Sequence, residues 1–136
     1  MVRKLADVSD AEMDVLQALW HDGPGTVREV GSRLEVGPGR RWAYTTVQTL
    51  LNRLEAKGWV ESNKGGLAHV YAAAVTREGF LAHSLRALSE RLCDGEALPL
   101  AAALVKGHRF KPEEIDRFRR LIDEYDRNRD TGNNKI

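Results

Sequence analysis

The sequence predicts a mainly α-helical fold in which three short helices and a β-hairpin precede a further group of helices. Apolar residues recur at helical spacing in the first three segments of the chain. The pattern then changes to two strand-like runs, Trp59–Asn63 and Leu67–Ala73, which flank Lys64-Gly65-Gly66. Helical spacing returns after Thr76. Three helices followed by a hairpin is the layout of a winged helix-turn-helix, so we expect this fold followed by a small all-α region.

Each of the first two helices begins at a capping box, in which a hydroxyl and a glutamate satisfy free backbone N–H groups. The two boxes are Ser9-Asp10-Ala11-Glu12 and Thr26-Val27-Arg28-Glu29. Turn residues end these helices at Asp22–Gly25 and at Val36–Gly39. Gly31, inside the second helix, leaves room for a neighbouring helix to approach closely.

The third helix is expected from about Ala43 to Lys57, with Gly58 as its C-cap glycine. Its inward stripe consists of Val47, Leu50, Leu51 and Leu54. The pair Gly65-Gly66 suits a tight hairpin turn that needs positive φ. Because an isolated hairpin is marginal in water, we expect it to pack on the helices, with Trp42 and Trp59 as packing residues.

The region after Thr76 is expected to hold three more helices. Thr76 is a candidate cap for the fourth helix, and Cys93-Asp94-Gly95 ends it. A short apolar helix should cover Ala97–Val105. The last helix should start at Lys111-Pro112-Glu113-Glu114, because a first turn tolerates proline and favours acids.

Two small domains and a tail are predicted from this pattern: a winged-helix DNA-binding domain at 1–75, a helical dimerisation domain at 76–126 and a disordered tail at 127–136. The helices after Thr76 carry much apolar surface but are too few and short to form a rich core alone. We therefore expect a second copy of the chain to cover that surface. The predicted dimer seam consists of Phe80, Leu85, Leu88, Leu92, Leu104, Ile115, Phe118, Leu121 and Ile122.

Composition places the chain among globular proteins and gives no direct support for nucleic-acid binding. Of its 136 residues 42% are hydrophobic and 30% charged, and the net charge is +1. The part up to Glu78 has ten basic and ten acidic residues, so DNA binding requires a local basic patch. One cysteine, Cys93, allows no internal disulfide and predicts a reducing cytoplasm. No run approaches the ~20 apolar residues of a membrane helix, so no membrane insertion is expected.

The outer face of the third helix carries the side chains that point to DNA. Amides can pair with adenine edges, and threonine offers a hydroxyl and a methyl group to thymine. The predicted base contacts are Tyr44, Thr45, Gln48, Thr49 and Asn52. The predicted phosphate contacts are Arg40, Arg41, Arg53, Lys57 and Lys64. The segment from Arg40 to Tyr71 is therefore expected to touch DNA, although an ordinary polar surface is the alternative interpretation of the same face.

The same residues resemble the penicillinase-repressor (BlaI/MecI/CopY) family. The resemblance lies in Ser9-Asp10-Ala11-Glu12 with Leu19-Trp20, in Thr45 to Leu54 with Lys57-Gly58, and in Val70-Tyr71. It runs from about Val8 to Tyr125. It implies a homodimeric cytoplasmic repressor that binds palindromic operators, commonly with TACA/TGTA half-sites, ahead of resistance or transport genes. It also implies dimerisation through the C-terminal helices.

The resemblance further implies a way of releasing the DNA. In penicillinase repressors, a signalled membrane-sensor protease cuts an Asn-Phe bond in the dimerisation region, and Ala103-Leu104 stand at that position here. The copper-responsive branch carries paired Cys-x-Cys motifs, and this chain has only Cys93, so no metal or cofactor is expected. Family members often have Ser-Pro-Lys where Ala43-Tyr44-Thr45 stand, which implies shifted operator details.

Three other functions compete with this interpretation. An enzyme is disfavoured because there is no glycine-rich phosphate loop and the histidines lack ligand spacing. A protein-interaction module that has lost DNA binding is compatible with the neutral first half. Sensing through Cys93 would use oxidation or a metal site shared with His83 and His108, whereas a lone cysteine is more often a small buried hydrophobe.

Overall fold

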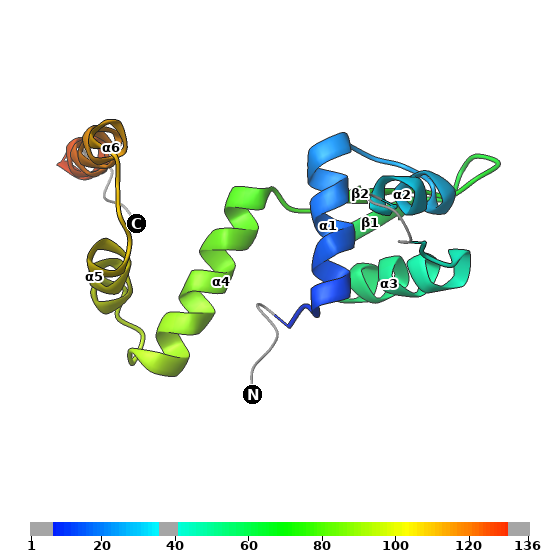
Figure 1. Ribbon diagram of the computed structural model, residues 1–136, viewed down its shortest axis with the longest axis horizontal. Coiled ribbons are helices and arrows are strands. Elements are labelled where there is room, and N and C mark those ends of the chain that lie inside the picture. Colours follow the sequence, from blue (N-terminus) through cyan, green and yellow to red (C-terminus); the bar gives the residue numbers. More distant parts are fainter. Residues whose placement is uncertain (1–6, 36–40, 131–136) are drawn as a thin grey trace. The chain divides into compact units, whose positions relative to one another are not determined.

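The computed structural model describes residues 7–35 and 41–130. The chain forms two compact units that divide between Leu88 and Ser89. The first unit contains α1 (Asp10–Asp22), α2 (Val27–Leu34), α3 (Tyr44–Ala56), β1 (Val60–Asn63), β2 (Val70–Ala73) and most of α4 (Arg77–Leu92) (Figure 1). This order confirms the predicted winged helix. Arg40 and the predicted end of the second helix at Val36–Gly39 lie outside the described residues.

The helix ends follow the predicted caps. In both capping boxes the hydroxyl accepts from the N–H of the glutamate three residues on, and that glutamate accepts from the cap N–H. Gly58 adopts φ +89° after the C-cap of α3. The Thr76 hydroxyl accepts from the N–H of Gly79 at 2.9 Å at the start of α4.

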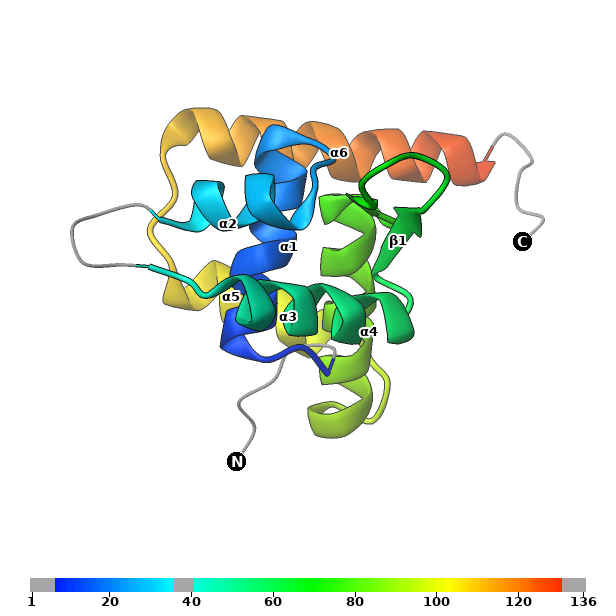
Figure 2. The ribbon, with the colours of Figure 1, turned by 90° about the vertical axis from the view of Figure 1, so that its right-hand side faces the viewer.

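The three N-terminal helices pack against one another and bury one core. Figure 2 shows α1 running across α2 and α3. Gly31 of α2 is buried, and a Cβ there would lie 3.7 Å from Val47 Cγ2 of α3, so the two helices approach closely as predicted. Trp42 and Trp59 pack against this core. Its buried residues are Val8, Val15, Leu16, Leu19, Val27, Val30, Leu34, Val47, Leu50, Leu51, Leu54, Val60, Tyr71 and Phe80.

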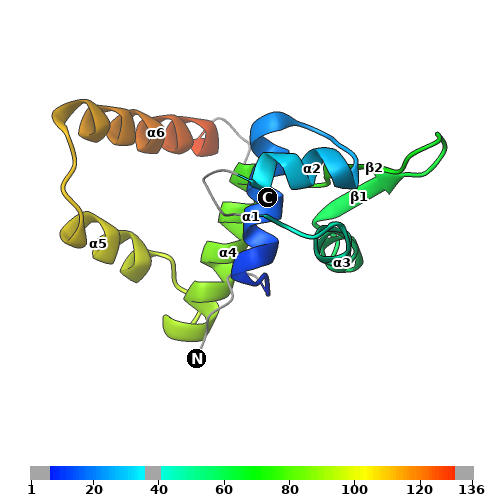
Figure 3. The ribbon, with the colours of Figure 1, turned by 45° about the vertical axis from the view of Figure 1, so that its right-hand side comes forward.

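The hairpin is an antiparallel pair with Asn63 opposite Val70, so its connecting loop is longer than the predicted tight turn. Neither Gly65 nor Gly66 adopts positive φ. The loop bends instead at an Asx turn, in which Asn63 Oδ1 accepts from the N–H of Gly65 at 2.9 Å. The second strand accordingly begins at Val70 rather than at Leu67. Figure 3 shows the loop projecting beyond α2 and α3, as a wing does.

The first unit extends further along the chain than the predicted boundary at residue 75. The reason is Phe80, on the first turns of α4. Its ring meets those of Trp20 and Trp59 edge to face, with centroids 5.5 and 4.9 Å apart. These contacts attach the beginning of α4 to the winged helix.

The second unit contains the end of α4, α5 (Leu98–Gly107) and α6 (Pro112–Asp130). Helix α6 continues through residues 127–130, which the sequence assigns to a disordered tail. An ion pair between Arg129 and Asp126, at 2.8 Å and one turn apart, supports this last turn. No described hydrophobic residue of this unit is buried. Among the described residues no helix is long and apolar enough to cross a membrane.

Candidate nucleic-acid interface

The outer face of α3 brings the five predicted base-contact residues together. The stripe Val47, Leu50, Leu51 and Leu54 is buried against the other helices, so the opposite side of α3 faces outward. Tyr44, Thr45, Thr49 and Asn52 are exposed there, and Gln48 is half-buried. The side chains at 44, 48 and 52 stand one turn apart, beside a second column at 45 and 49. The result is a continuous surface of hydroxyls and amides with no acidic side chain among these five positions.

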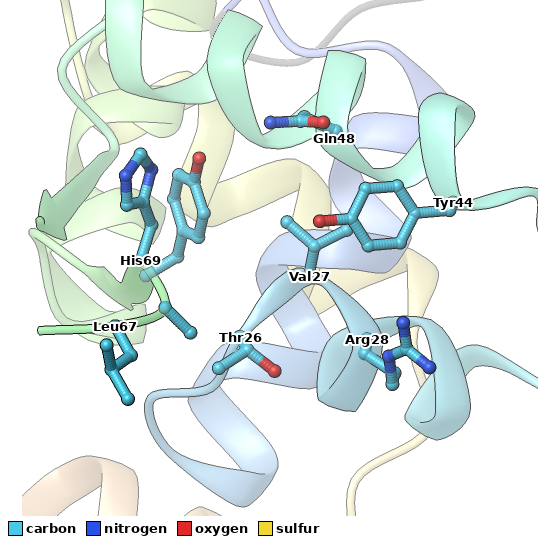
Figure 4. Close-up of a pocket in the computed structure, with 9 residues that line it drawn as sticks. Thr26, Val27, Arg28, Tyr44, Gln48, Leu67 and His69 are labelled. Atoms are coloured by element: carbon cyan, nitrogen blue, oxygen red, sulfur yellow. The ribbon is translucent and has the colours of Figure 1, made fainter.

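A groove of about 420 Å³ borders this face on the wing side (Figure 4). It lies between the start of α2, the first half of α3 and the wing. Its lining residues are Thr26, Val27, Arg28, Tyr44, Gln48, Leu67, Ala68, His69 and Tyr71. Arg28 and His69 are exposed within it, so a cationic guanidinium and an imidazole flank the polar face of α3.

Tyr71, on strand β2 of the wing, contacts this face of α3 through its hydroxyl. The side chain is 1% exposed, and its hydroxyl donates to Asn52 Oδ1 at 3.4 Å. Burial and the nearby charge of Glu55 raise the pKa of Tyr71, while a hydrogen bond from the Gln48 side chain opposes that rise. The hydroxyl is therefore protonated at neutral pH and is available as a hydrogen-bond donor.

The predicted phosphate contacts fall into two groups. Arg41, Arg53 and Lys64 are exposed near the ends of α3 and in the wing loop. Lys57 requires a correction, because its ammonium donates to Glu12 Oε1 at 2.8 Å and to the carbonyl of Asp7 at 2.7 Å. Its side chain is only 27% exposed, so this lysine fastens α3 to α1 instead of facing a phosphate.

Glu12 is the buried partner of that lysine. Burial alone would raise the pKa of Glu12, but hydrogen bonds from Lys57 and from the Ser9 backbone outweigh it and hold the pKa below its ordinary value. The carboxylate therefore stays ionised and serves the capping box and the ion pair together.

The predicted dimer seam also requires one correction. Phe80 is 3% exposed and is enclosed by Trp20 and Trp59 within the first unit, so it is unavailable to a second copy of the chain. The other predicted seam residues are exposed on the surfaces of α4, α5 and α6. They are Leu85, Leu88, Leu92, Leu104, Ile115, Phe118, Leu121 and Ile122. Ala103 and Leu104, at the predicted cleavage position, lie inside α5 and are exposed.

The residues considered for metal sensing do not form a cluster. The ring of His83 packs edge to face on Trp59 at 5.0 Å, and that of His108 packs on Phe110 at 4.6 Å. Across residues 7–35 and 41–130, no three His, Cys, Asp or Glu side chains are placed to hold a metal ion. Cys93, which follows α4, is a half-buried free thiol.

Sequence reasoning missed three residues at this site. Tyr71 was placed only at the end of a segment, yet the alternation along β2 puts it on the same inner side as Ala73, and a buried tyrosine hydroxyl needs a partner. Arg28 appeared only as part of a capping box. His69 is not singled out by any pattern in the sequence. The proximity of Arg28 and His69 to α3 depends on tertiary packing, which no local pattern reveals.

Comparisons with known proteins find relatives along nearly the whole chain. The family model of the penicillinase repressor matches residues 8–124. The penicillinase repressor of Bacillus licheniformis is 24% identical over 124 residues, covering 91% of this chain and 95% of that protein. The transcriptional regulator BlaI of Mycobacterium tuberculosis is 33% identical over 123 residues, covering 89% of this chain and 86% of that protein.

A solved structure is similar to part of the chain. The solution structure of the monomeric form of Bacillus licheniformis BlaI in complex with the blaP half-operator is 30% identical. The similarity covers 57% of this chain and 92% of that chain, with a TM-score of 0.44. The family model spans most of the sequence and covers parts of both units. The chain therefore belongs to the penicillinase repressor family of transcriptional regulators.

Proposed function

We propose that the protein represses transcription by binding, as a homodimer, to palindromic DNA operators ahead of resistance, stress or transport genes. The observation that carries this proposal is the outer face of α3, where amides and hydroxyls are gathered on an exposed surface beside a wing. Such side chains can pair with base edges in the major groove. Family membership supports the same role.

Arginines and a lysine around this face supply the phosphate contacts. Arg41, Arg53 and Lys64 are exposed, and Arg28 at the groove adds a fourth cation. Glu55, an acid of α3, accepts from Ser62 Oγ at 2.7 Å and is held against β1. A local excess of positive charge thus accompanies a chain whose net charge is only +1.

Dimerisation is supported by the apolar surface of the second unit. Leu121 is 62% exposed and Phe118 40% exposed on α6. A monomer that leaves such a stripe in water is unusual, and a second copy would bury it. Two recognition helices would then lie about 34 Å apart, in successive major grooves. Each half-site alone binds weakly, so loosening the dimer releases the DNA.

Release by a membrane-sensor protease is part of the proposal. The Ala103-Leu104 bond lies within the exposed α5, and a cut there would separate α6 from the rest of the chain. The cut would remove from the dimer the apolar stripe of α6, which consists of Ile115, Phe118, Leu121 and Ile122.

The proposal is tested by titrating the protein against DNA from upstream of its own gene and against a shuffled duplex of equal length, at several salt concentrations. We expect tighter binding to the upstream duplex, and affinity that falls steeply with salt. Gln48→Ala should weaken binding to the upstream duplex alone, whereas Arg41→Ala should weaken binding to both.

Two outcomes would contradict the proposal. Equal affinity for both duplexes would leave only non-specific binding. Absence of binding to either would favour a protein-interaction module that keeps the winged helix without its DNA.

A further inference from the structure

Tyr71 is fixed in the fold at three points. Its backbone N–H donates to the carbonyl of Gly25 at 2.8 Å, and its carbonyl accepts from the N–H of Gly25 at 2.9 Å. Its ring is buried in the core at 1% exposure. A side chain held by the backbone on one side and by the core on the other presents its hydroxyl in one place.

The hydroxyl lies next to side chains on the outer face of α3. The hydroxyl donates to Asn52 Oδ1 at 3.4 Å, and the Gln48 side chain lines the same groove as Tyr71. A hydroxyl has one hydrogen, which here goes to Asn52, so toward Gln48 the hydroxyl can act only as an acceptor. In Figure 4 the amide nitrogen of Gln48 points toward the His69 side and its oxygen toward the Tyr44 side.

We propose that Tyr71 is a positioning residue for DNA recognition, whose hydroxyl fixes the amide orientation of Gln48 and Asn52 and thereby the bases that α3 selects. This inference rests on the proposed function. With its oxygen held by Tyr71, Asn52 presents its amide N–H groups, which match acceptors such as guanine O6 and N7. Gln48 keeps its carbonyl oxygen and one N–H, the pair that adenine accepts.

The wing cannot readily swing away from these amides. Ser62 Oγ on β1 donates to Glu55 Oε2 of α3 at 2.7 Å, and Ser62 stands opposite Tyr71 in the hairpin. Both strands of the wing are thus tied to α3. An amide that can rotate between two orientations accepts two sets of base edges, and one that is held accepts a single set.

The test compares wild type, Tyr71→Phe and Tyr125→Phe by selection of bound duplexes from random DNA. Tyr71→Phe keeps the buried ring and removes only the hydroxyl. Tyr125→Phe removes the same group from a side chain that is 70% exposed on α6, and so serves as the matched control. The thermal unfolding midpoint of each variant is measured to establish that it is folded.

We expect Tyr71→Phe to lose base preference at the positions that Gln48 and Asn52 contact, while the other positions stay unchanged. Its affinity for the wild-type selected duplex should fall by about tenfold, and its affinity for an unrelated duplex should stay within about twofold. Tyr125→Phe should match wild type. In the Gln48→Ala/Asn52→Ala background, Tyr71→Phe should have no further effect on selection, because its targets are gone.

Three results would overturn the inference alone: unchanged base preference in Tyr71→Phe, an equal loss on selected and unrelated duplexes, or a full effect in the double-alanine background. Wild type that selects no sequence would instead overturn the proposed function, and this inference with it.

Discussion

The two units of the chain differ in how they place their apolar residues. The first unit encloses a core that includes Leu16, Leu51 and Leu54, each essentially without exposure. In the second unit the described helices bury no hydrophobic residue, and Leu98 and Leu121 are 76% and 62% exposed. The unit that carries the polar face of α3 therefore has a buried core of its own. The other unit exposes its apolar stripes, and a second copy of the chain would bury them in the proposed dimer.

The largest expected effect tests whether Phe80 belongs to the core of the first unit or to the dimer seam. Phe80→Ala should lower the free energy of unfolding of the first unit by about 3–5 kcal/mol, because it opens a cavity between two tryptophan rings. Urea unfolding followed by tryptophan fluorescence measures this, since all three tryptophans, Trp20, Trp42 and Trp59, lie in that unit. Leu81→Ala, at a side chain 52% exposed, is the control and should cost under about 1 kcal/mol. If Phe80→Ala lowered the free energy of unfolding by no more than this control, Phe80 would be assigned to the dimer seam after all.

The second effect concerns the stripe of α6. Phe118→Asp should yield a monomer in sedimentation and weaken operator binding by about 100-fold, because the second half-site no longer adds to the first. The tryptophan-reported unfolding of the first unit should stay close to wild type. Arg120→Asp places the same carboxylate on the opposite side of the helix and should remain dimeric. A Phe118→Asp variant that sediments as a dimer would put the seam elsewhere.

The third effect sharpens the account of the first unit's core. Glu12→Gln should cost about 1–3 kcal/mol at pH 7, because it removes a buried carboxylate bonded to Lys57 and to the Ser9 N–H. The folded pKa of Glu12 is lowered, so its ionised form stabilises the fold above the ordinary glutamate pKa of about 4.3. That stability is lost as the pH falls through the lower, folded pKa.

The difference between Glu12→Gln and wild type should therefore shrink as unfolding is measured at progressively lower pH. Glu61→Gln, at an exposed strand position, is the control, and its free energy of unfolding should stay close to that of wild type throughout this pH series. A Glu12→Gln difference that stayed constant down to acid pH would mean that the ion pair adds nothing to stability.

The smallest effect separates a surface cation from a structural one. Arg53→Ala should reduce the slope of log affinity against log salt by about 1.8, because the dimer loses one phosphate contact from each of its two copies. Lys57→Met should leave that slope unchanged and lower the unfolding midpoint instead, because its ammonium is held by Glu12 and Asp7. Reversed results would restore Lys57 to the DNA contacts and remove Arg53 from them.

Local patterns in the sequence predict most of the fold. Ser9 and Thr26 begin their helices through nearest-neighbour chemistry, and the stripe of α3 needs only helical spacing, so these features were confirmed. The hairpin was predicted, but its turn was wrong, because Asn63 bends the chain before the glycines are reached.

The errors at the candidate site come from contacts between residues far apart in sequence. Lys57 resembles a surface cation until α1 brings Glu12 to it. Phe80 continues the apolar stripe of α4, and only the tertiary fold shows that Trp20 and Trp59 enclose it. The link between Tyr71 and Asn52 likewise depends on the register of the wing against α3. Periodicity identifies a face, and packing decides what that face meets.

The central claim is that two copies of the polar face of α3 recognise DNA together. Its most direct test is selection of bound duplexes from random DNA by the wild-type protein, followed by sequencing. The account predicts one half-site enriched in two inverted copies, with centres about 10 base pairs, or a multiple of one helical turn, apart. Enrichment of no sequence, or of a single half-site without its inverted copy, would contradict it.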